Sequence, residues 1–283
     1  MDLAAAQAHA LELVRDHDKD RYLAALFVPD EMRGRVAALC AFNVELARIR
    51  DHMREPMLGE IRLQFWADQV EAILAGETPE HPVAQALADA IRGAALPERA
   101  FRGMIEARRF DLYDDPMPTL NDLEGYLGET SSALIQLSAL AVAGPAAETA
   151  AHAAGSAGVA IGIAGLLRSL PLYRSRGQSY LPGDVLARHG VTVAHVLSGR
   201  ESPEMAAVLA DLRAHARKRL AEARAEIGRI PEAALPAFLP AALVDGYLNA
   251  LDRAGLAALR APVEVPQWQR QARLLWSAWR DRF

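Results

Sequence analysis

The chain has 283 residues, of which 52% are hydrophobic and 24% charged, as is ordinary for a soluble globular protein. A formal net charge of −5 gives no general basic footprint, so we expect no nucleic-acid partner. The single cysteine, Cys40, excludes a disulfide framework or a cysteine metal site within the chain, and its apolar neighbours predict a buried thiol in a reducing compartment.

Helical periodicity runs through the first half of the chain, whereas alternating β-branched residues and hairpin turns are nearly absent. The N-terminus lacks the basic start and cleavage site of a secretory signal, so we expect a protein that is not secreted. Pro29 marks a break, Asp30 is placed to cap the next helix, and Pro56 stops that helix. The helices predicted here cover about 2–18, 30–55, 57–75, 81–93 and 97–113.

The second half of the chain also reads as helices. The small residues of 155–165 predict close helix packing rather than a phosphate loop, because no strand precedes them and no Gly-Lys-Ser/Thr follows. Polar residues and a proline interrupt the apolar stretch 134–167, so we predict two buried helices rather than a membrane span. The predicted elements are a loop at 114–118, a helix at 119–143 with a polar interruption at 129–132, a helix from Pro145 to a break at Leu170-Pro171, and helices at about 184–189, 192–197, 202–227, 231–259 and 267–283.

No stretch reads as a flexible linker, so we predict one all-α domain over residues 1–283. Its terminal helix contains Trp276, Trp279 and Arg280. Such a helix can dock its Leu/Trp face onto the core, or it can lie on a membrane surface as a peripheral contact.

Catalytic and metal-binding patterns are weak. The eight histidines are scattered, without the spacing of paired metal ligands. Asp51 and Glu55 are four residues apart, so on one helix they would share a face and could hold a divalent cation. Arg48, Arg50 and Arg54 surround them, and ion pairing on a solvated face is the simpler alternative.

Three stretches in order resemble the squalene/phytoene synthase family, within a resemblance that covers about residues 21–259. They are 21–42 (RYLAALFVPDEMRGRVAALCAF), 111–126 (DLYDDPMPTLNDLEGY) and 167–182 (LRSLPLYRSRGQSYLP). The last is specific, because the family's basic and closing residues fall in place at Arg168, Arg176, Gly177, Tyr180, Leu181 and Pro182. The resemblance implies an all-α bundle of the isoprenoid synthase type around a central cavity. It also implies an ancestral reaction that joins two prenyl diphosphates head to head, with Mg²⁺ held by two aspartate-rich motifs.

Both aspartate-rich motifs are degenerate in this chain. Where the family's first motif has paired aspartates, the chain has Ala47 and Arg48, and only Asp51 remains. In the second motif, the two aspartate positions hold Ser169 and Tyr173. Losing one well-placed electrostatic stabiliser costs about 2.7–4 kcal/mol of transition-state stabilisation. We therefore assign no catalytic residue and expect no cofactor. If the protein is catalytic after all, we expect it to use Mg²⁺, with Asp51 as a ligand.

Three further segments resemble one divergent branch of the family, the mitochondrial complex I assembly factors and their bacterial relatives. These segments are 41–46 (AFNVEL), 57–66 (MLGEIRLQFW) and 81–84 (HPVA). The closer resemblance implies a non-catalytic protein that assists biogenesis of respiratory complex I. Its partner would be a respiratory-complex subunit or a prenyl lipid, and its location cytoplasmic or peripheral on the inner face of the membrane.

Two alternatives remain open. One is a prenyltransferase with unusual metal ligation by Asp51, Glu55 and Glu45. The other is a prenyl-lipid or quinone binding module, in which arginines hold an anionic head. The same arginines could instead form ion pairs that connect the broken helix to neighbouring carboxylates. Tyr173 could likewise fill the space that the metal ion occupies in active members of the family. The candidate ligand-binding residues are Phe42, Glu45, Arg48, Asp51, Arg168, Tyr173, Arg176 and Tyr180.

Overall fold

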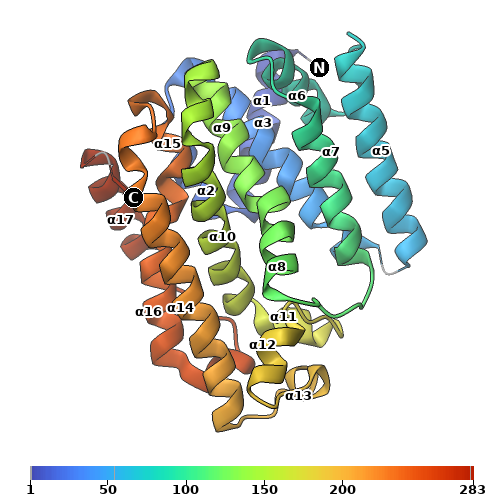
Figure 1. Cartoon of the computed structure of the whole chain (residues 1–283). Coiled ribbons are helices and arrows are strands. Elements are labelled where there is room, and N and C mark those ends of the chain that lie inside the picture. The colour runs from blue at the N-terminus through green and yellow to red at the C-terminus, as the bar shows by residue number, and fades with distance from the viewer. Residues whose placement is uncertain (1, 54, 281) are drawn as a thin grey trace.

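The computed structural model describes residues 2–53, 55–280 and 282–283, and none of these residues forms a strand. The predicted all-α class is confirmed. The longer helices run side by side along one direction, with the N-terminal half of the chain on one side of the bundle and the C-terminal half on the other (Figure 1). Shorter helices close the end of the bundle below α8 (Leu120–Leu127) and α14 (Pro203–Ala225).

The helices of the first half are α1 (Leu3–His17), α2 (Lys19–Ala25), α3 (Asp30–Ala47), α4 (Ile49–His52), α5 (Pro56–Leu74), α6 (Pro82–Gly93), α7 (Glu98–Ala107), the 3₁₀ turn η1 (Arg108–Leu112), α8 (Leu120–Leu127), the π-helical turn η2 (Gly128–Ser132) and α9 (Ala133–Ala143). Those of the second half are η3 (Gly144–Ala150), α10 (Ala151–Arg168), α11 (Leu170–Ser175), α12 (Gly183–Arg188), α13 (Val193–Ser198), α14 (Pro203–Ala225), η4 (Ile227–Arg229), η5 (Glu232–Ala234), α15 (Leu235–Phe238), η6 (Leu239–Leu243), α16 (Val244–Ala254), η7 (Gly255–Leu259) and α17 (Gln267–Trp279).

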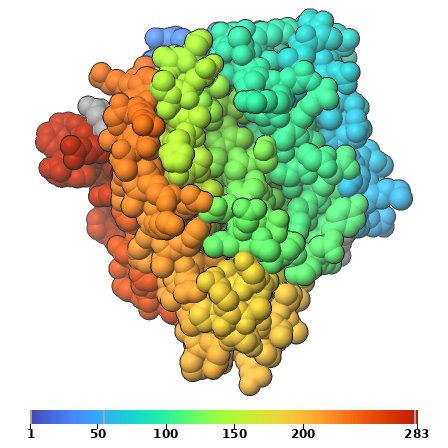
Figure 2. All heavy atoms as spheres, viewed as in Figure 1, coloured from blue at the N-terminus to red at the C-terminus, as the bar shows by residue number. Residues whose placement is uncertain are grey.

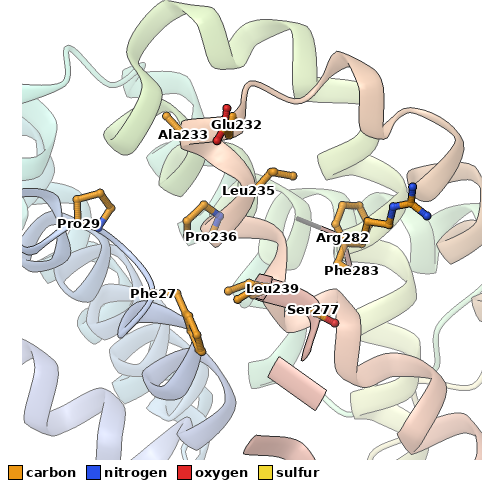
Figure 3. A pocket seen from close by; sticks show the side chains of 11 residues that line it. Phe27, Pro29, Glu232, Ala233, Leu235, Pro236, Leu239, Ser277, Arg282 and Phe283 are labelled. Atoms are coloured by element: carbon orange, nitrogen blue, oxygen red, sulfur yellow. The ribbon is translucent and has the colours of Figure 1, made fainter. Parts of the chain in front are cut away.

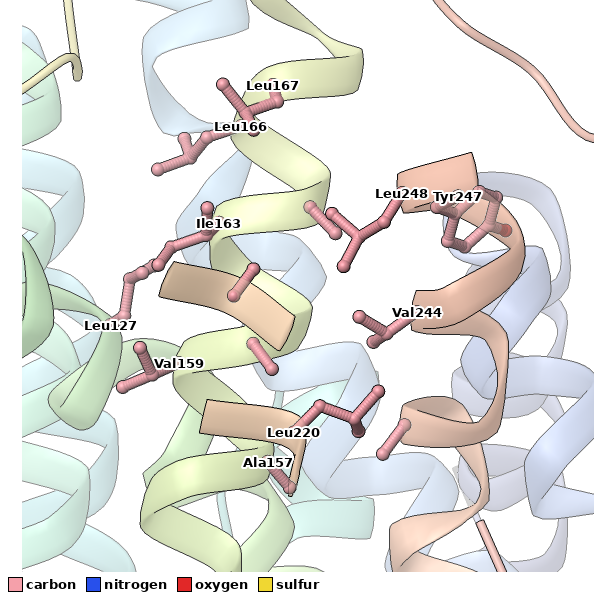
Figure 4. Close-up of a cluster of buried hydrophobic side chains, with 14 of the residues drawn as sticks. Leu127, Ala157, Val159, Ile163, Leu166, Leu167, Leu220, Val244, Tyr247 and Leu248 are labelled. Carbon is pink, nitrogen blue, oxygen red and sulfur yellow. The ribbon is translucent and has the colours of Figure 1, made fainter. Parts of the chain in front are cut away.

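Two hydrophobic clusters form the interior. The N-terminal cluster lies among α1, α3, α5, α6 and α7. The C-terminal cluster centres on α10, with Leu220 of α14 and Leu248 of α16 packed around it (Figure 4). Helix α9 contributes Leu134 to the first cluster and Ile135 to the second, so it connects them. The two halves of the bundle therefore meet along α9.

Helix α10 is rich in glycine because its neighbours approach its backbone closely. A Cβ added to Gly158 would lie 2.4 Å from backbone atoms of Ser132, and one added to Gly162 would lie 2.3 Å from the Leu127 side chain. The prediction that small residues serve close helix packing is confirmed at Gly158 and Gly162, whereas a Cβ added at Gly155 or Gly165 would meet nothing within 4 Å.

Two stretches of the described chain, Leu120–Arg168 and Glu232–Leu259, are long and apolar enough to cross a membrane by length and composition alone. Within the bundle, 67% and 72% of their most apolar windows are buried. Core helices of a globular protein have the same character. This burial agrees with the prediction of buried helices over 134–167.

The helix predicted over 30–55 is wrong in its second half. α3 ends at Ala47, and α4 is a separate short helix after which Met53 is extended, with φ −117° and ψ 103°. Asp51 and Glu55 therefore do not share a helix, and their predicted common face does not exist. Arg54, the third of the arginines predicted around them, lies outside the described residues. Asp30 also does not cap α3: it is the first helical residue, and it pairs with Arg33 at 2.6 Å.

Other boundaries differ for identifiable reasons. The polar interruption at 129–132 coincides with the π-helical turn η2, where the Thr130 hydroxyl donates to the Tyr126 carbonyl at 2.8 Å. The break predicted at Leu170-Pro171 occurs one residue earlier, at Ser169, and Pro171 sits in the first turn of α11, where its missing N–H costs nothing. The helix predicted over 231–259 is divided into short α and 3₁₀ pieces.

Candidate functional site

The two degenerate aspartate-rich motifs, called here the first signature (41–51) and the second signature (167–182), meet between α4 and the turn after α11. Asp51 Oδ1 lies 2.6 Å from Arg176 Nη1, and the two side chains are about one-third exposed. Gly177 follows with φ +75°, a left-handed conformation that favours glycine. The turn after α11 therefore requires this glycine, and the one carboxylate that remains from the first signature is neutralised by an arginine of the second.

The other two candidate arginines point elsewhere. Arg48 Nη1 contacts His17 Nε2 at 2.8 Å, near the end of α1. Arg168 Nε donates to the Val263 carbonyl at 2.9 Å, and its guanidinium lies 3.6 Å from the centre of the Tyr247 ring. Arg48, Arg168 and Arg176 each have a different partner, so they do not form a single anion-binding site.

The remaining first-signature candidates belong to helix packing. Glu45 pairs with Arg62 of α5 at 2.9 Å. Phe42 is fully buried, with its ring 5.4 Å from Trp66 and 5.8 Å from Phe101. Both side chains hold α3 to its neighbours in the N-terminal cluster.

The second-signature positions that replace aspartates have different surroundings. Ser169 lies at the break between α10 and α11, where its carbonyl accepts from the Leu172 and Tyr173 amides at 3.0 and 3.3 Å. The Tyr173 ring packs edge-on against Tyr180 at 4.7 Å. Burial raises the pKa of Tyr173 to about 12, and the nearby Asp111 adds to this shift. Tyr173 is thus a neutral, packed side chain where the family has a metal-binding carboxylate.

Tyr173 and Tyr180 belong to an aromatic cluster that also contains Phe110 and Tyr126. The Tyr180 ring lies 5.7 Å from both Phe110 and Tyr126, and Phe110 lies 5.9 Å from Tyr126. Aromatic rings at these distances pack favourably beyond the area that they bury. The aromatic cluster therefore ties the segment after α11 to η1 and α8.

Asp111 is the centre of a buried polar network that the sequence analysis missed. It is only 7% exposed, and it accepts from Arg108 at 3.0 Å, from the Tyr126 hydroxyl at 2.8 Å and from the Tyr180 hydroxyl at 2.6 Å. Arg108 also donates to Asn43 of α3 at 3.2 Å. These contacts join α3 of the first signature to Tyr180 of the second.

The surroundings of this network keep the Tyr126 and Tyr180 hydroxyls and the Arg108 guanidinium protonated. Burial raises the pKa of both Tyr126 and Tyr180, and the neighbouring Asp111 adds to the shift, so both phenols remain hydrogen-bond donors. Burial acts to lower the pKa of Arg108, but Tyr126 and Asp111 outweigh it and hold this pKa above its ordinary value. The one signal in the sequence was the i, i+3 spacing of Arg108 and Asp111, which is compatible with an ion pair.

A magnesium site of the family's kind does not fit these residues. Within residues 2–53, 55–280 and 282–283, no three His, Cys, Asp or Glu side chains gather closely enough to hold a metal ion. Mg²⁺ prefers oxygen ligands such as carboxylates. None of Ala47, Arg48, Ser169 and Tyr173 has a carboxylate, and Asp51 is paired with Arg176.

A cleft of about 570 Å³ opens beside the aromatic cluster, between α7 and α8. These helices lie on the face that is turned to the viewer in Figure 2. Phe110, Met117 and Tyr126 contribute to the lining of the cleft. Among the described residues that line it, three are acidic and none is basic. The three acidic residues are Glu106, Asp122 and Glu129. Glu106 is paired with Arg109 at 2.8 Å, whereas Asp122 and Glu129 would repel an anionic diphosphate.

A second cavity, of about 630 Å³, is lined by residues that belong to neither signature. Residues of the turn between α2 and α3, of α15 and of the C-terminus line it, among them Phe27, Pro236 and Phe283 (Figure 3). None of the candidate residues named from the sequence contributes to its lining.

Comparison with known proteins decides the family, because a model of the squalene/phytoene synthase family matches residues 14–280. The chain belongs to this family. Its fold resembles that of a dehydrosqualene synthase solved with a ligand, with a TM-score of 0.87 at 19% identity over 98% of this chain and 96% of that one. A squalene synthase from Alicyclobacillus acidocaldarius gives a TM-score of 0.79 at 22% identity, over 89% and 95% of the two chains. The predicted isoprenoid synthase fold is confirmed.

Among curated relatives, this family member is similar to proteins named NADH dehydrogenase (ubiquinone) complex I, assembly factor 6. The rat protein (Rattus norvegicus) is 34% identical over 275 residues, which cover 97% of this chain and 82% of the relative. A phytoene synthase from Thermus thermophilus is 28% identical over 261 residues, which cover 92% and 88%. The resemblance to the assembly-factor branch is thereby confirmed.

Proposed function

We propose that this family member is non-catalytic and assists the biogenesis of respiratory complex I. The observation that carries the proposal is the ion pair between Asp51 and Arg176, which occupies the one carboxylate left from the two motifs. The similarity to relatives named complex I assembly factor 6 gives the proposal its direction.

The family's reaction depends on a metal ion that neutralises the diphosphate leaving group. Here the other aspartate positions of the two motifs carry no carboxylate, the remaining Asp51 is paired with Arg176, and the adjacent aromatic cluster is packed with neutral side chains. The fold then serves as a rigid helical body with a binding surface. Its partner would be a complex I subunit, met in the cytoplasm or at the inner face of the membrane.

Deletion of the gene in its host, followed by complementation, tests this function. We expect the deletion to lower NADH:quinone oxidoreductase activity and assembled complex I in isolated membranes. The wild-type gene should restore both, and Asp51→Ala should restore them equally, because no metal-dependent step is involved. Unchanged complex I in the deletion strain would contradict the proposal.

An assay of the pure protein addresses the prenyltransferase alternative directly. Farnesyl or geranylgeranyl diphosphate with Mg²⁺ should give no squalene- or phytoene-type product. Robust product formation that Asp51→Ala abolishes would establish the enzyme instead, with Glu45 and Glu55 as further ligands to examine.

One observation favours binding of a prenylated quinone as a second function. The cleft between α7 and α8 has apolar and aromatic lining beside Phe110 and Tyr126, and its acidic residues suit a neutral head better than a diphosphate. Calorimetric titration with a short-chain ubiquinone, using Gly125→Trp to fill the cleft, tests it. Binding that is lost in the variant supports this function, and no binding by the wild type rejects it.

A further inference from the structure

Helix α17 carries three of the chain's four tryptophans, and all three are exposed. Trp268 and Trp279 expose 67% and 74% of their surface, Leu275 exposes 61% and Trp276 exposes 47%. Their separations of three, four, seven and eight residues place them on one side of the helix. We call these four residues the Trp stripe; a contiguous exposed apolar surface of this kind marks an interaction site.

The opposite side of α17 fixes the helix to the bundle. Leu274 is buried, and Arg270 forms an ion pair of 2.5 Å with Asp20 of α2. Beyond the helix, Phe283 stacks on Phe238 at 5.5 Å. The Trp stripe is therefore held outward on a rigid support, at the edge of the molecule where Figure 1 shows α17. The prediction that a Leu/Trp face docks onto the core is right for Leu274 and wrong for the tryptophans.

The charge around the Trp stripe is opposite to that of the whole chain. Residues 267–283 contain four arginines and one acidic residue, whereas the chain has a net charge of −5. Arg282 is exposed, and the Arg280 guanidinium lies 4.2 Å from the Trp276 ring centre. The other two arginines bind the bundle: Arg270 pairs with Asp20, and Arg273 donates to the Ala242 carbonyl at 3.2 Å. Exposed tryptophans with neighbouring arginines match the boundary between lipid headgroups and acyl chains, where indole rings and basic side chains both find partners.

We propose that the Trp stripe binds an anionic lipid surface, with α17 lying in the headgroup plane and Arg280 and Arg282 contacting lipid phosphates. The site does not involve Asp51, the aromatic cluster or complex I. It therefore stands or fails separately from the proposed function.

Vesicle sedimentation tests the proposal with the full chain. We expect the protein to sediment with phosphatidylcholine vesicles that contain phosphatidylglycerol, and weakly or not at all with phosphatidylcholine alone. Replacing all three exposed tryptophans by alanine should weaken binding at least about tenfold. The matched control is Met57→Ala with Ile61→Ala, which removes side chains of 74% and 62% exposure from α5, on the opposite flank of the bundle, and it should bind as the wild type. Circular dichroism checks that each variant is folded.

Tryptophan fluorescence supplies a second readout. Lipids with brominated acyl chains should quench the exposed tryptophans, while Trp66, which is fully buried, retains its emission. Arg280→Gln with Arg282→Gln should remove the preference for anionic vesicles. The proposal is overturned if the wild-type protein does not sediment with anionic vesicles at low salt, which is the result expected if the Trp stripe bound only a protein. Equal loss of binding in the α5 control, or an absence of bromine quenching, would overturn it as well.

Discussion

Asp51 and Arg176 form an ion pair of 2.6 Å that joins α4 to the turn after α11. In the family, the corresponding signatures would both turn carboxylates toward a shared metal ion. In this chain only Asp51 keeps a carboxylate, and it is paired with Arg176, a basic residue that the family also has at this position. The positive charge is built into the sequence, so the contact between the signatures needs no metal.

The first prediction concerns metal dependence. We expect neither Mg²⁺ nor EDTA to change the thermal unfolding midpoint, because Asp51 is already paired. Asp51→Asn should cost about 0–1 kcal/mol of unfolding free energy, the usual value for a partly exposed pair. Differential scanning fluorimetry and urea unfolding measure both effects. A Mg²⁺-induced rise of the midpoint that Asp51→Asn removes would show a metal site.

The second prediction concerns the buried network around Asp111. Tyr180→Phe removes the hydroxyl that donates to Asp111 at 2.6 Å and leaves a buried acceptor short of one partner. We expect a loss of about 1–3 kcal/mol of unfolding free energy. Tyr113→Phe is the control: its hydroxyl donates to Glu60 at 3.1 Å on the surface, so its removal should cost less than about 0.5 kcal/mol. Equal losses in urea unfolding would contradict the importance of the network.

The third prediction follows from the raised pKa of Tyr173. Its pKa in the folded chain is about 12, against an ordinary value of 10. The folded state therefore holds this proton more tightly than the unfolded state, so the contribution is fully present below pH 10 and is lost as the pH rises from 10 through 12. The free energy of unfolding should decrease between pH 10 and 12, and the decrease should be smaller in Tyr173→Phe than in the wild type. Urea titrations at fixed pH steps measure it, and an identical slope in both proteins would refute the assignment.

The helical bundle could be predicted from the sequence, because the patterns that specify its helices are local and recur along the chain. Apolar periodicity, prolines and glycine-rich packing positions each act within a few residues, and Gly158 and Gly162 do meet their neighbours closely. The break at Arg48 was missed, because the helical periodicity of the sequence continues through it and Arg48 itself stays near the α region, with φ −95° and ψ −1°.

The candidate site was harder to predict, because its contacts join residues that are distant in the chain. Asp111 bonds to Tyr180, 69 residues away, and Arg108 bonds to Asn43, 65 residues away. Comparison of motifs identified which carboxylates were missing. It could not show that a different carboxylate, Asp111, lies buried nearby with three donors of its own.

The last prediction separates two glycines of α10 that differ only in their surroundings. A Cβ at Gly158 would lie 2.4 Å from the Ser132 backbone, which cannot move aside without shifting η2, whereas a Cβ at Gly155 meets nothing within 4 Å. Gly158→Ala should therefore destabilise the protein by about 1–3 kcal/mol through overpacking. Gly155→Ala should stabilise it by about 0.5–1 kcal/mol, because alanine loses less backbone entropy in a helix than glycine does. Urea unfolding of the two variants measures the difference. A stabilising Gly158→Ala would mean that α10 and η2 are further apart than the structure places them.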